Sequence, residues 1–395
     1  MKYKITPIDP LISRDARPFG AGGRVRSLDW LTQTATAGAV RTALWKRLED
    51  RNDENALNAL HDVRVRGPFP MVDGRLYFPR PLDIAVSVKI VRDEKDPNIV
   101  KEKITSVWQI KPITIPEDCH VEMPKGCEGL IPAEPDTDED FKPEKLNPFW
   151  TGGRMSQWLK AGKRDFVLFG EDGKETDTLP ALARDERVHV NIDPATGTSK
   201  EGMLFSTTGL DFVQGNVKKK QPLRQGYAAI DVEVPDGLPS LPERFTAPLG
   251  GERRLAEFNR EDDCQDLWDC PLSMEFHRGD KIRLVLASPA IFAQGWLPGW
   301  IDKASLEGTI PGTETRLKLV SAVTGRWQPI SGWCYEKGHT GPKPTRRMVP
   351  AGSVYFMELM SETFNSASLW LSSVCDEARD RSDGLGLALW GKGEW

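Results

Sequence analysis

KYKITPI at residues 2–8 and TAGAVRTALWKRLED at residues 36–50 are the two stretches that decide how the fold begins. In the first, charged and apolar side chains alternate with the period of two that is typical of a strand. In the second, apolar residues recur on one face of a helix, and Thr34 or Thr36 is placed to cap its first turn. The chain is therefore predicted to open with a strand and then a helix.

Further along, the chain consists mainly of short strand-like stretches separated by its 35 glycines and 30 prolines. Apolar and polar residues alternate at residues 230–234 and 317–323, and VYFMEL at residues 354–359 is a third such series. A more continuous apolar run at residues 282–286 predicts a central strand, and a second helix is predicted at residues 367–379. Strands interleaved with occasional helices favour an α+β fold over a regular βαβ alternation.

The 395 residues exceed what one hydrophobic core usually serves and predict two or three domains. The clearest linker or insertion lies at residues 128–144, where seven acidic residues and three prolines stand against one basic residue, Lys142. Such a segment buries too little apolar surface to order itself. We therefore place a domain boundary near residue 150, which divides the chain into residues 1–150 and 151–395.

Several classes of protein are excluded by what the sequence lacks. It contains no run of about 18 apolar residues, so no membrane span is predicted, and its N-terminus lacks the apolar segment of a secretory signal. Its six cysteines are too few for a disulfide framework, so we expect reduced thiols in a cytoplasmic protein. Cys119, His120 and Cys127 lie close in sequence, but zinc requires four ligands and Cys264/Cys270 is a badly spaced second pair. We expect neither a metal nor a cofactor.

Positive charge is concentrated at the start of the chain. The first 47 residues carry nine basic and three acidic side chains, a net charge of +6, whereas the whole chain carries −5, so the remaining 348 residues carry −11. This asymmetry is typical of a basic groove on an acidic body. Arg14, Arg17, Arg24 and Arg26 surround three glycines; arginine forks bind phosphate oxygens, and glycines allow the backbone to approach them. A solvated surface loop with screened charges is the alternative.

Three further basic clusters are candidates for the same phosphate-binding surface, although each cluster alone is weak evidence. They are Lys218, Lys219 and Lys220; Arg253 and Arg254; and Arg346 and Arg347. Four tryptophans, Trp296, Trp300, Trp327 and Trp333, lie in a stretch rich in Gly and Pro where rings can be exposed, although most tryptophans in proteins are core residues. Aromatic rings beside basic residues suit single-stranded RNA, whose bases stack on rings while its phosphates pair with cations.

No catalytic constellation is recognisable in the sequence. His277, in EFHRGDK, is the best placed of the five histidines for acid–base catalysis because Arg278 and Lys281 are nearby, but a structural or surface role is expected for each of them. The C-terminus imitates a P-loop, but Gly393 follows Lys392 where Ser or Thr must bind Mg²⁺. We therefore expect no enzymatic activity.

Six stretches in a fixed order carry a family resemblance. They read ITPIDPLISRDARPFG, TAGAVRTAL, RVHVNIDPATGTSKEGMLF, PLGGERRL, RMVPAGSVYFMEL and GLGLALWGKGEW. Together they resemble the RAMP-superfamily subunit that caps the five-prime end of the guide RNA in type III-B (Cmr) CRISPR effector complexes, over about residues 4–395. Residues 88–149 are the least family-like part, and we interpret them as an insertion that includes the acidic run.

The resemblance implies two RRM-like (ferredoxin-like) RAMP modules with insertions, which we expect at residues 1–150 and 151–395. It also implies a non-catalytic subunit that grips the repeat-derived five-prime tag of the guide RNA. Its partners in a hetero-oligomeric complex are then the large palm-domain subunit and the first backbone RAMP subunit.

A glycine-rich loop near the C-terminus is the family's further RNA contact, and the resemblance assigns it to Gly384, Gly386, Gly391 and Lys392. This chain departs from the family pattern, because only four residues separate Gly386 from Gly391 and the basic residue lies outside the loop. A structural turn that closes the last strand is the alternative.

Two other functions stay open at this point. One is a metal-independent RAMP endoribonuclease that trims the guide-RNA precursor through a histidine such as His277. The other is a scaffold that binds only proteins.

Overall fold

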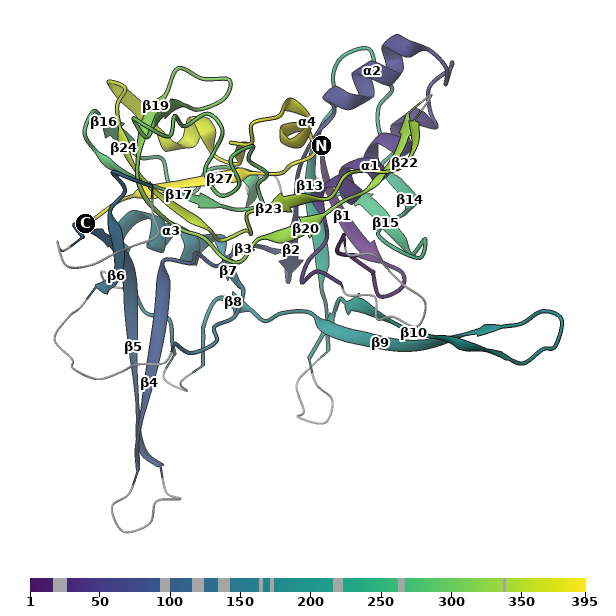
Figure 1. The fold of residues 1–395 in the computed structure, drawn as a ribbon, viewed down its shortest axis with the longest axis horizontal. Helices are drawn as coiled ribbons and strands as arrows, with labels where there is room; N and C mark the ends of the chain where they lie inside the picture. The colour runs from purple at the N-terminus through teal and green to yellow at the C-terminus, as the bar shows by residue number, and fades with distance from the viewer. Residues whose placement is uncertain are drawn as a thin grey trace.

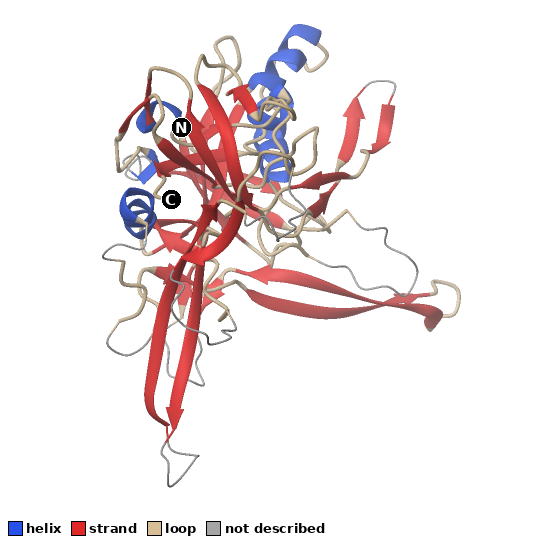
Figure 2. Ribbon diagram, turned by 60° about the vertical axis from the view of Figure 1, so that its left-hand side comes forward, coloured by secondary structure: helices blue, strands red, loops and turns tan. Residues whose placement is uncertain are grey.

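The computed structural model describes residues 1–16, 27–92, 100–115, 124–133, 143–162, 166–170, 174–215, 223–261, 267–336 and 339–395. Within these ranges the fold is rich in strands and has few helices, as the α+β prediction requires. Strands fill the centre of the molecule, and two long hairpins project from it in different directions (Figures 1 and 2).

The first large sheet has eight strands, and every neighbouring pair in it is antiparallel. In spatial order they are β14 (Arg244–Pro248), β15 (Leu255–Arg260), β1 (Lys2–Pro7), β13 (Tyr227–Glu233), β2 (Arg64–Val72), β3 (Arg75–Pro79), β7 (Phe149–Thr151) and β8 (Thr178–Leu179).

The second large sheet has six strands, and it is also antiparallel throughout. In spatial order they are β18 (Glu307–Thr309), β19 (Arg316–Val323), β24 (Val354–Leu359), β17 (Lys281–Leu286), β27 (Leu387–Lys392) and β26 (Ser372–Ser373).

Both sheets contain four strands in the same spatial order. When β1, β2, β13 and β15 are numbered 1 to 4 along the chain, they lie in the order 4-1-3-2, and so do β17, β19, β24 and β27. This is the strand order of the ferredoxin-like, split βαβ arrangement. In the first sheet a helix, α1 (Gln33–Trp45), connects strands 1 and 2, whereas the corresponding connection in the second sheet, residues 287–315, contains no helix anywhere along its fully described length.

The domain boundary predicted near residue 150 does not separate the two sheets. Strand β7 spans that position, and β13, β14 and β15 return to the first sheet much later in the chain. The chain passes to the second sheet only between Arg260 and Lys281. The acidic run lies between β3 and β13, in a long insertion that also supplies β7 and β8 at one edge of the first sheet, so it does not lie between the two sheets.

The remaining strands form smaller sheets. They are β4 (Ile84–Arg92), β5 (Val100–Ile113) and β6 (Gly129–Ala133) in one three-stranded sheet, and the pairs β9 (Ala183–Ile192) with β10 (Ser199–Asp211), β11 (Val213–Gln214) with β12 (Arg224–Gln225), β16 (Glu275–His277) with β25 (Thr363–Asn365), β20 (Gln328–Ile330) with β23 (Arg346–Met348), and β21 (Trp333–Glu336) with β22 (His339–Pro342). Strand β6 occupies the start of the acidic stretch, and residues 134–142 of that stretch lie outside the described residues.

The first predicted helix is confirmed as α1, but its start, its end at Trp45 and its cap differ from the prediction. The helix begins at Gln33, and its N-cap is Thr32, whose side chain makes no capping hydrogen bond. Thr36 does not cap the helix, because its hydroxyl donates to the carbonyl oxygen of Thr32 at 3.1 Å from within the helix. Two other helices, α2 (Glu54–Asp62) and α3 (Gly152–Ala161), were not predicted.

The second predicted helix, at residues 367–379, is wrong. The segment starts as a 3-10 helix, η3 (Ser366–Leu369), turns at Leu371 with a φ of 54°, and then forms edge strand β26. Only α4 (Ala378–Ser382) is α-helical there. Pairing with the edge of β27 and burial of Leu371 and Val374 outweigh the helical spacing of the sequence.

The five predicted strands are confirmed as β1, β13, β17, β19 and β24. The period-two pattern was nevertheless a poor guide to burial in β13. Asp231 alternates with apolar residues in this strand, yet it is buried as they are. It accepts Lys2 Nζ at 2.8 Å and also pairs with Arg66, which together compensate the buried charge.

The core between the two sheets contains a buried ion pair. Phe69 and Phe78 of the first sheet share one apolar cluster with Val285 and Phe356 of the second sheet. Inside this interface Arg283 Nη1 donates to Asp83 Oδ2 at 2.8 Å, and both side chains are almost completely buried. The pair therefore links strand β17 of the second sheet to the insertion that follows β3.

Candidate nucleic-acid interface

The basic N-terminal segment is anchored at two places by its own apolar residues. Leu11 and Ile12 are buried, and they follow β1 directly. Leu11 exchanges two backbone hydrogen bonds with Leu210 near the end of β10, at 3.1 and 2.7 Å. The carbonyl oxygen of Ile12 accepts the Gly251 amide at 2.7 Å. The segment thus runs between the base of hairpin β9–β10 and the turn that joins β14 to β15.

Three predicted basic residues meet at this turn. The Arg14 side chain lies across Gly251, where an added Cβ would stand only 3.1 Å from Arg14 Cδ, so glycine makes room for the arginine. Arg14 and Arg253 are exposed, and Arg253 has a φ of 51°. Arg254 approaches Asp9 Oδ2 at 3.8 Å. The sequence offered these arginines as two separate clusters, and the structure brings them together.

The other end of the basic segment returns to the same place. Ser27 forms a bridge with Arg14, and its hydroxyl donates to the carbonyl oxygen of Thr208 in β10. The Leu28 amide donates to the Ser13 carbonyl oxygen at 2.7 Å. Residues 17–26, with Arg17, Arg24 and Arg26, lie outside the described residues, but both of their flanks are held beside the base of hairpin β9–β10.

Hairpin β9–β10 carries exposed apolar side chains that the sequence analysis did not single out. Its turn runs from Asp193 to Gly197, and Gly197 has a φ of 68°. Val188 is 70% exposed and Leu204 59% exposed. The hairpin projects from the body of the molecule (Figure 1), so its apolar side chains are not covered by the core. The alternation of Val188 and Val190 with polar residues was the sequence signal for this apolar face.

Three of the basic side chains in the first 47 residues are committed to ion pairs inside the fold. Lys2 pairs with Asp231, and Lys4 Nζ lies 2.6 Å from Glu261. Arg41 is buried and binds Asp383. The N-terminal charge excess therefore overstates the basic surface, because part of it neutralises acidic residues from the later part of the chain.

The other predicted basic clusters do not join this surface as a group. Lys218, Lys219 and Lys220 lie outside the described residues. Arg346 donates to both carboxylate oxygens of Asp380 at 2.8 Å. Burial lowers the pKa of Arg346, but these bonds and the neighbouring carboxylates outweigh it, and the pKa rises above its ordinary value. Arg346 is thus a structural ion-pair partner.

Arg347 and the tryptophans of the second half have mixed positions. The Arg347 guanidinium lies 4.9 Å from the centre of the Trp327 ring. Trp327 and Trp333 are exposed, as a stacking role requires, whereas Trp296 and Trp300 are half-buried. Trp300 Nε1 donates to the Val374 carbonyl oxygen at 2.9 Å, which makes it a packing residue.

The C-terminal glycines that the resemblance assigns to the RNA are buried packing positions. A Cβ on Gly384 would stand 2.1 Å from the carbonyl oxygen of Val65 in β2, and one on Gly386 would stand 2.6 Å from Cys375 Sγ. A Cβ on Gly391 would meet Leu159 of α3 at 2.7 Å. The neighbouring Lys392 is exposed and lies 3.9 Å from Glu394. The missing side chains of these glycines allow β27 and the residues just before it to pack closely against β2, Cys375 and α3.

Replacing Gly384 with alanine is expected to destabilise the protein by about 3 kcal/mol or more, because overpacking and a left-handed backbone both oppose a Cβ there. Gly74→Ala is the matched control, since Gly74 has a similar φ of 72° against 83° but open space around it. Its expected cost is about 1 kcal/mol. Equilibrium urea unfolding measures both. Equal losses in the two variants would contradict the packing role.

No histidine in the described residues stands at the turn where Arg14, Arg253 and Arg254 meet. His277 is exposed at the end of β16, and its amide donates to Asp280 Oδ2 at 2.8 Å. Its neighbour Arg278 pairs with Glu362 at 3.0 Å. His189 Nε2 lies 2.8 Å from Thr207 Oγ1, and its ring stacks on Phe205. Among the described residues, the two basic neighbours of His277 are thus engaged elsewhere, Arg278 with Glu362 and Lys281 with the Trp395 carbonyl oxygen.

The cysteine cluster is only partly described. Cys119, His120 and Cys264 lie outside the described residues, whereas Cys127 is buried in the core of the second sheet. Elsewhere in the described chain no group of three His, Cys, Asp or Glu residues is arranged to hold a metal ion. None of the described helices is long and apolar enough to cross a lipid bilayer.

Comparison with known proteins identifies the family. The family model described as "CRISPR-associated protein (Cas_Cmr3)" matches residues 3–393.

Among curated proteins, none matches the chain. A chain of the type III-B Cmr-beta complex bound to cognate target RNA and AMPPnP is 14% identical, with 90% of this chain and 86% of that chain covered and a TM-score of 0.45. A chain of the Csm3–Csm4 subcomplex of the type III-A interference complex is 9% identical, with 91% and 94% covered and a TM-score of 0.35. The family model spans nearly the whole sequence, so the resemblance to the type III-B (Cmr) subunits is confirmed, and the chain belongs to the Cas_Cmr3 family of CRISPR-associated proteins.

Proposed function

We propose that the chain is a non-catalytic, guide-RNA-binding subunit of a type III-B CRISPR ribonucleoprotein. In this role it grips the five-prime tag of the guide RNA and docks the large palm-domain subunit and the first backbone RAMP subunit. The binding surface consists of the basic turn, defined by Arg14, Arg253 and Arg254, together with the arginines at positions 17, 24 and 26.

One observation carries the proposal. The segment that contains the first arginines is fixed at both ends, by Leu11 and by Ser27, beside a turn that adds two more arginines. Fixed flanks reduce the conformational entropy that the segment loses when it closes on a polyanion. Arginine forks recognise phosphate oxygens bidentately and need no acid–base partner. A surface of this kind suits a subunit that holds RNA without cleaving it.

The modules of this proposal follow the sheets and not the predicted boundary. We assign one RRM-like module to β1, β2, β13 and β15 and a second to β17, β19, β24 and β27, which share the order 4-1-3-2. The insertion between β3 and β13 supplies hairpin β9–β10. Its exposed Val188 and Leu204 are available to contact RNA bases or a neighbouring subunit.

The experiment is purification of the ribonucleoprotein through an affinity tag on this chain, followed by sequencing of the bound small RNA and ultraviolet crosslinking. We expect RNAs that share a constant five-prime segment, with crosslinks from that segment to this chain. RNA without a constant segment would overturn the tag assignment. A complex whose RNA crosslinks only to other subunits would support the protein-only scaffold instead.

The endoribonuclease alternative is tested on the same material. Incubation of the purified protein with labelled repeat RNA in EDTA is expected to leave the RNA intact, because the basic neighbours of the exposed His277 are engaged elsewhere, Arg278 with Glu362 and Lys281 with the Trp395 carbonyl oxygen. Cleavage by the wild-type protein that His277→Ala abolishes would contradict our assignment.

A further inference from the structure

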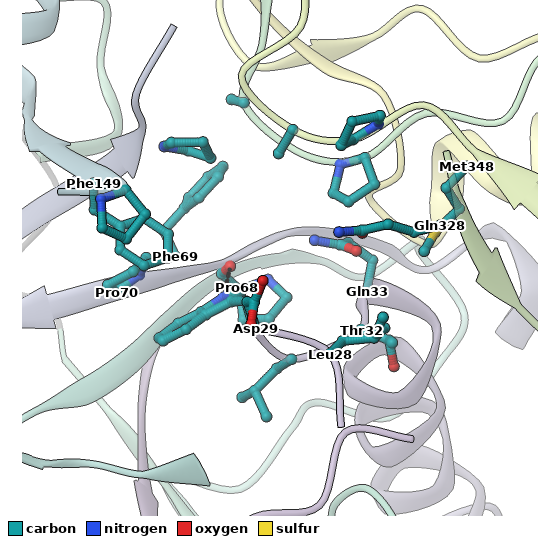
Figure 3. Close-up of a pocket in the computed structure, with 18 of the residues that line it drawn as sticks. Leu28, Asp29, Thr32, Gln33, Pro68, Phe69, Pro70, Phe149, Gln328 and Met348 are labelled. Atoms are coloured by element: carbon teal, nitrogen blue, oxygen red, sulfur yellow. Dashed lines mark hydrogen bonds between the residues drawn. The ribbon is translucent and has the colours of Figure 1, made fainter. Parts of the chain in front are cut away.

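A pocket of about 200 Å³ lies between the two large sheets, beside the first turn of α1 (Figure 3). Its walls are mainly apolar, with Pro68 and Phe69 from β2, Phe149 from β7 and Met348 from β23. It is smaller than the pockets of roughly 300–1,000 Å³ that hold drug-sized ligands. Its size therefore suits a single ring system and not a whole nucleotide cofactor.

The side chain of Gln33 is the unusual feature of this pocket. The residue is only 3% exposed, and its amide makes no hydrogen bond to any part of the described chain. Figure 3 shows the side chain extending from the first turn of α1 into the pocket, with the side chain of Gln328 from β20 beside it. The Gln33 amide is not one of the fully buried side-chain groups that lack a partner, so its polar atoms are open to the pocket. Its donor and its acceptor are therefore both available to a ligand in the pocket.

The helix end next to Gln33 is open as well. The N-cap Thr32 lines the pocket but its side chain makes no capping bond, and the first turn contains no acidic residue. The amide groups of a first helical turn have no partner within the helix and attract acceptor atoms. The pocket therefore borders an uncapped helix end, and each glutamine amide offers it both a donor and an acceptor.

We propose that this pocket holds one unstacked nucleobase of the guide RNA. This proposal rests on the proposed function and adds to it a site that recognises a base. A glutamine amide matches the paired donor and acceptor of a base edge. Single-stranded RNA is recognised by splaying bases out and reading these edges against apolar or aromatic walls. A neutral ring fits this lining better than a phosphate does, because the walls are mainly apolar and Arg80 Nη1 donates to the carbonyl oxygens of Pro81 and Ile84 at 3.3 and 3.4 Å.

The position of the pocket connects it to the basic turn. Leu28 and Asp29 line the pocket, and Ser27, one residue earlier, is bound to the base of hairpin β9–β10. Arg184 at the start of β9 donates to the Leu28 carbonyl oxygen at 2.9 Å and pairs with Asp29. A strand of RNA held at the basic turn is thus adjacent to the residues that lead into the pocket.

The test combines a protein variant with an altered RNA. The RNA is a synthetic copy of the five-prime segment recovered with the purified ribonucleoprotein, intact or with one abasic residue at each position in turn. The full-length chain, Gln33→Leu and Gln328→Leu are compared by fluorescence anisotropy. For the wild-type chain, one abasic position is expected to weaken binding about tenfold, and both variants are expected to weaken binding of intact RNA by about the same factor. The abasic RNA should bind the variants and the wild type equally.

Gln225→Leu is the matched control, since Gln225 is exposed on β12 and outside the pocket, and it should bind like the wild type. Thermal unfolding verifies that each variant folds. If intact RNA binds with its salt dependence unchanged but neither glutamine variant loses affinity, the base site is overturned and the proposed function stands. Failure of the wild-type chain to bind the recovered RNA overturns both.

Discussion

Reversal of Arg14, Arg17, Arg24 and Arg26 to glutamate is expected to weaken guide-RNA binding about a hundredfold or more at 0.1 M salt. Each arginine that neutralises a phosphate of a single strand releases roughly 0.7 counterions, so loss of four contacts lowers the salt slope by up to about three. The measurement is the affinity of the purified chain for guide RNA between about 50 and 200 mM salt, the range over which such contacts are screened.

The control is a variant with the same change in net charge at a different place. Arg64, Arg244, Arg278 and Arg316 are all exposed, and their ion pairs with surface carboxylates are of the weak, solvent-screened kind. Their reversal is expected to reduce affinity only modestly and to leave the salt slope nearly unchanged. If both quadruple variants behave alike, net charge and not a defined surface accounts for binding, and the basic turn loses its assigned role.

Breaking the buried pair between Arg283 and Asp83 is expected to have the largest effect on folding. Asp83→Ala removes the carboxylate that accepts Arg283 Nη1 and Trp158 Nε1, both at 2.8 Å, and leaves a buried guanidinium charge without its counter-ion. The expected loss is about 3–5 kcal/mol in the free energy of unfolding. Urea unfolding followed by tryptophan fluorescence measures it.

A second variant separates charge from packing at this site. Arg283→Met together with Asp83→Leu removes both charges and keeps apolar volume, so we expect it to recover most of the stability lost in Asp83→Ala. The recovery is limited because Arg283 Nε also donates to the Lys392 carbonyl oxygen at 2.7 Å, and this acceptor then loses its partner. A double variant as unstable as the single one would show that the hydrogen bonds to the backbone, and not the paired charges, hold the sheets together.

The sequence predicted the strands well because their local pattern and their environment agree. Residues 354–359 and 282–286 became β24 and β17, which lie side by side at the centre of the second sheet. The helix predicted at residues 367–379 failed because the free edge of β27 and the core beneath it compete for the same residues. Local spacing contains no information about such a competitor.

The sequence predicted some residues of the candidate interface but not how they are arranged in space. The arginines at positions 14, 253 and 254 were recognised as basic clusters, but nothing in their spacing indicated that Ile12 pairs with Gly251 and so brings them to one turn. The sequence also suggested an RNA contact for Gly384 and its neighbours, where the structure shows close packing against Val65. Gln33 was overlooked, because a single glutamine in a helical stretch gives no local signal.

The sequence alone determined the family, the strand-rich α+β class and the surplus of positive charge near the N-terminus, since ordered motifs, periodicity and composition are properties of the chain itself. Only the tertiary structure decided which of those charges face solvent. Lys2, Lys4 and Arg41 are held by Asp231, Glu261 and Asp383, which lie hundreds of residues away in the chain. Burial requires each charge to find a partner, and folding alone determines which partners come within reach.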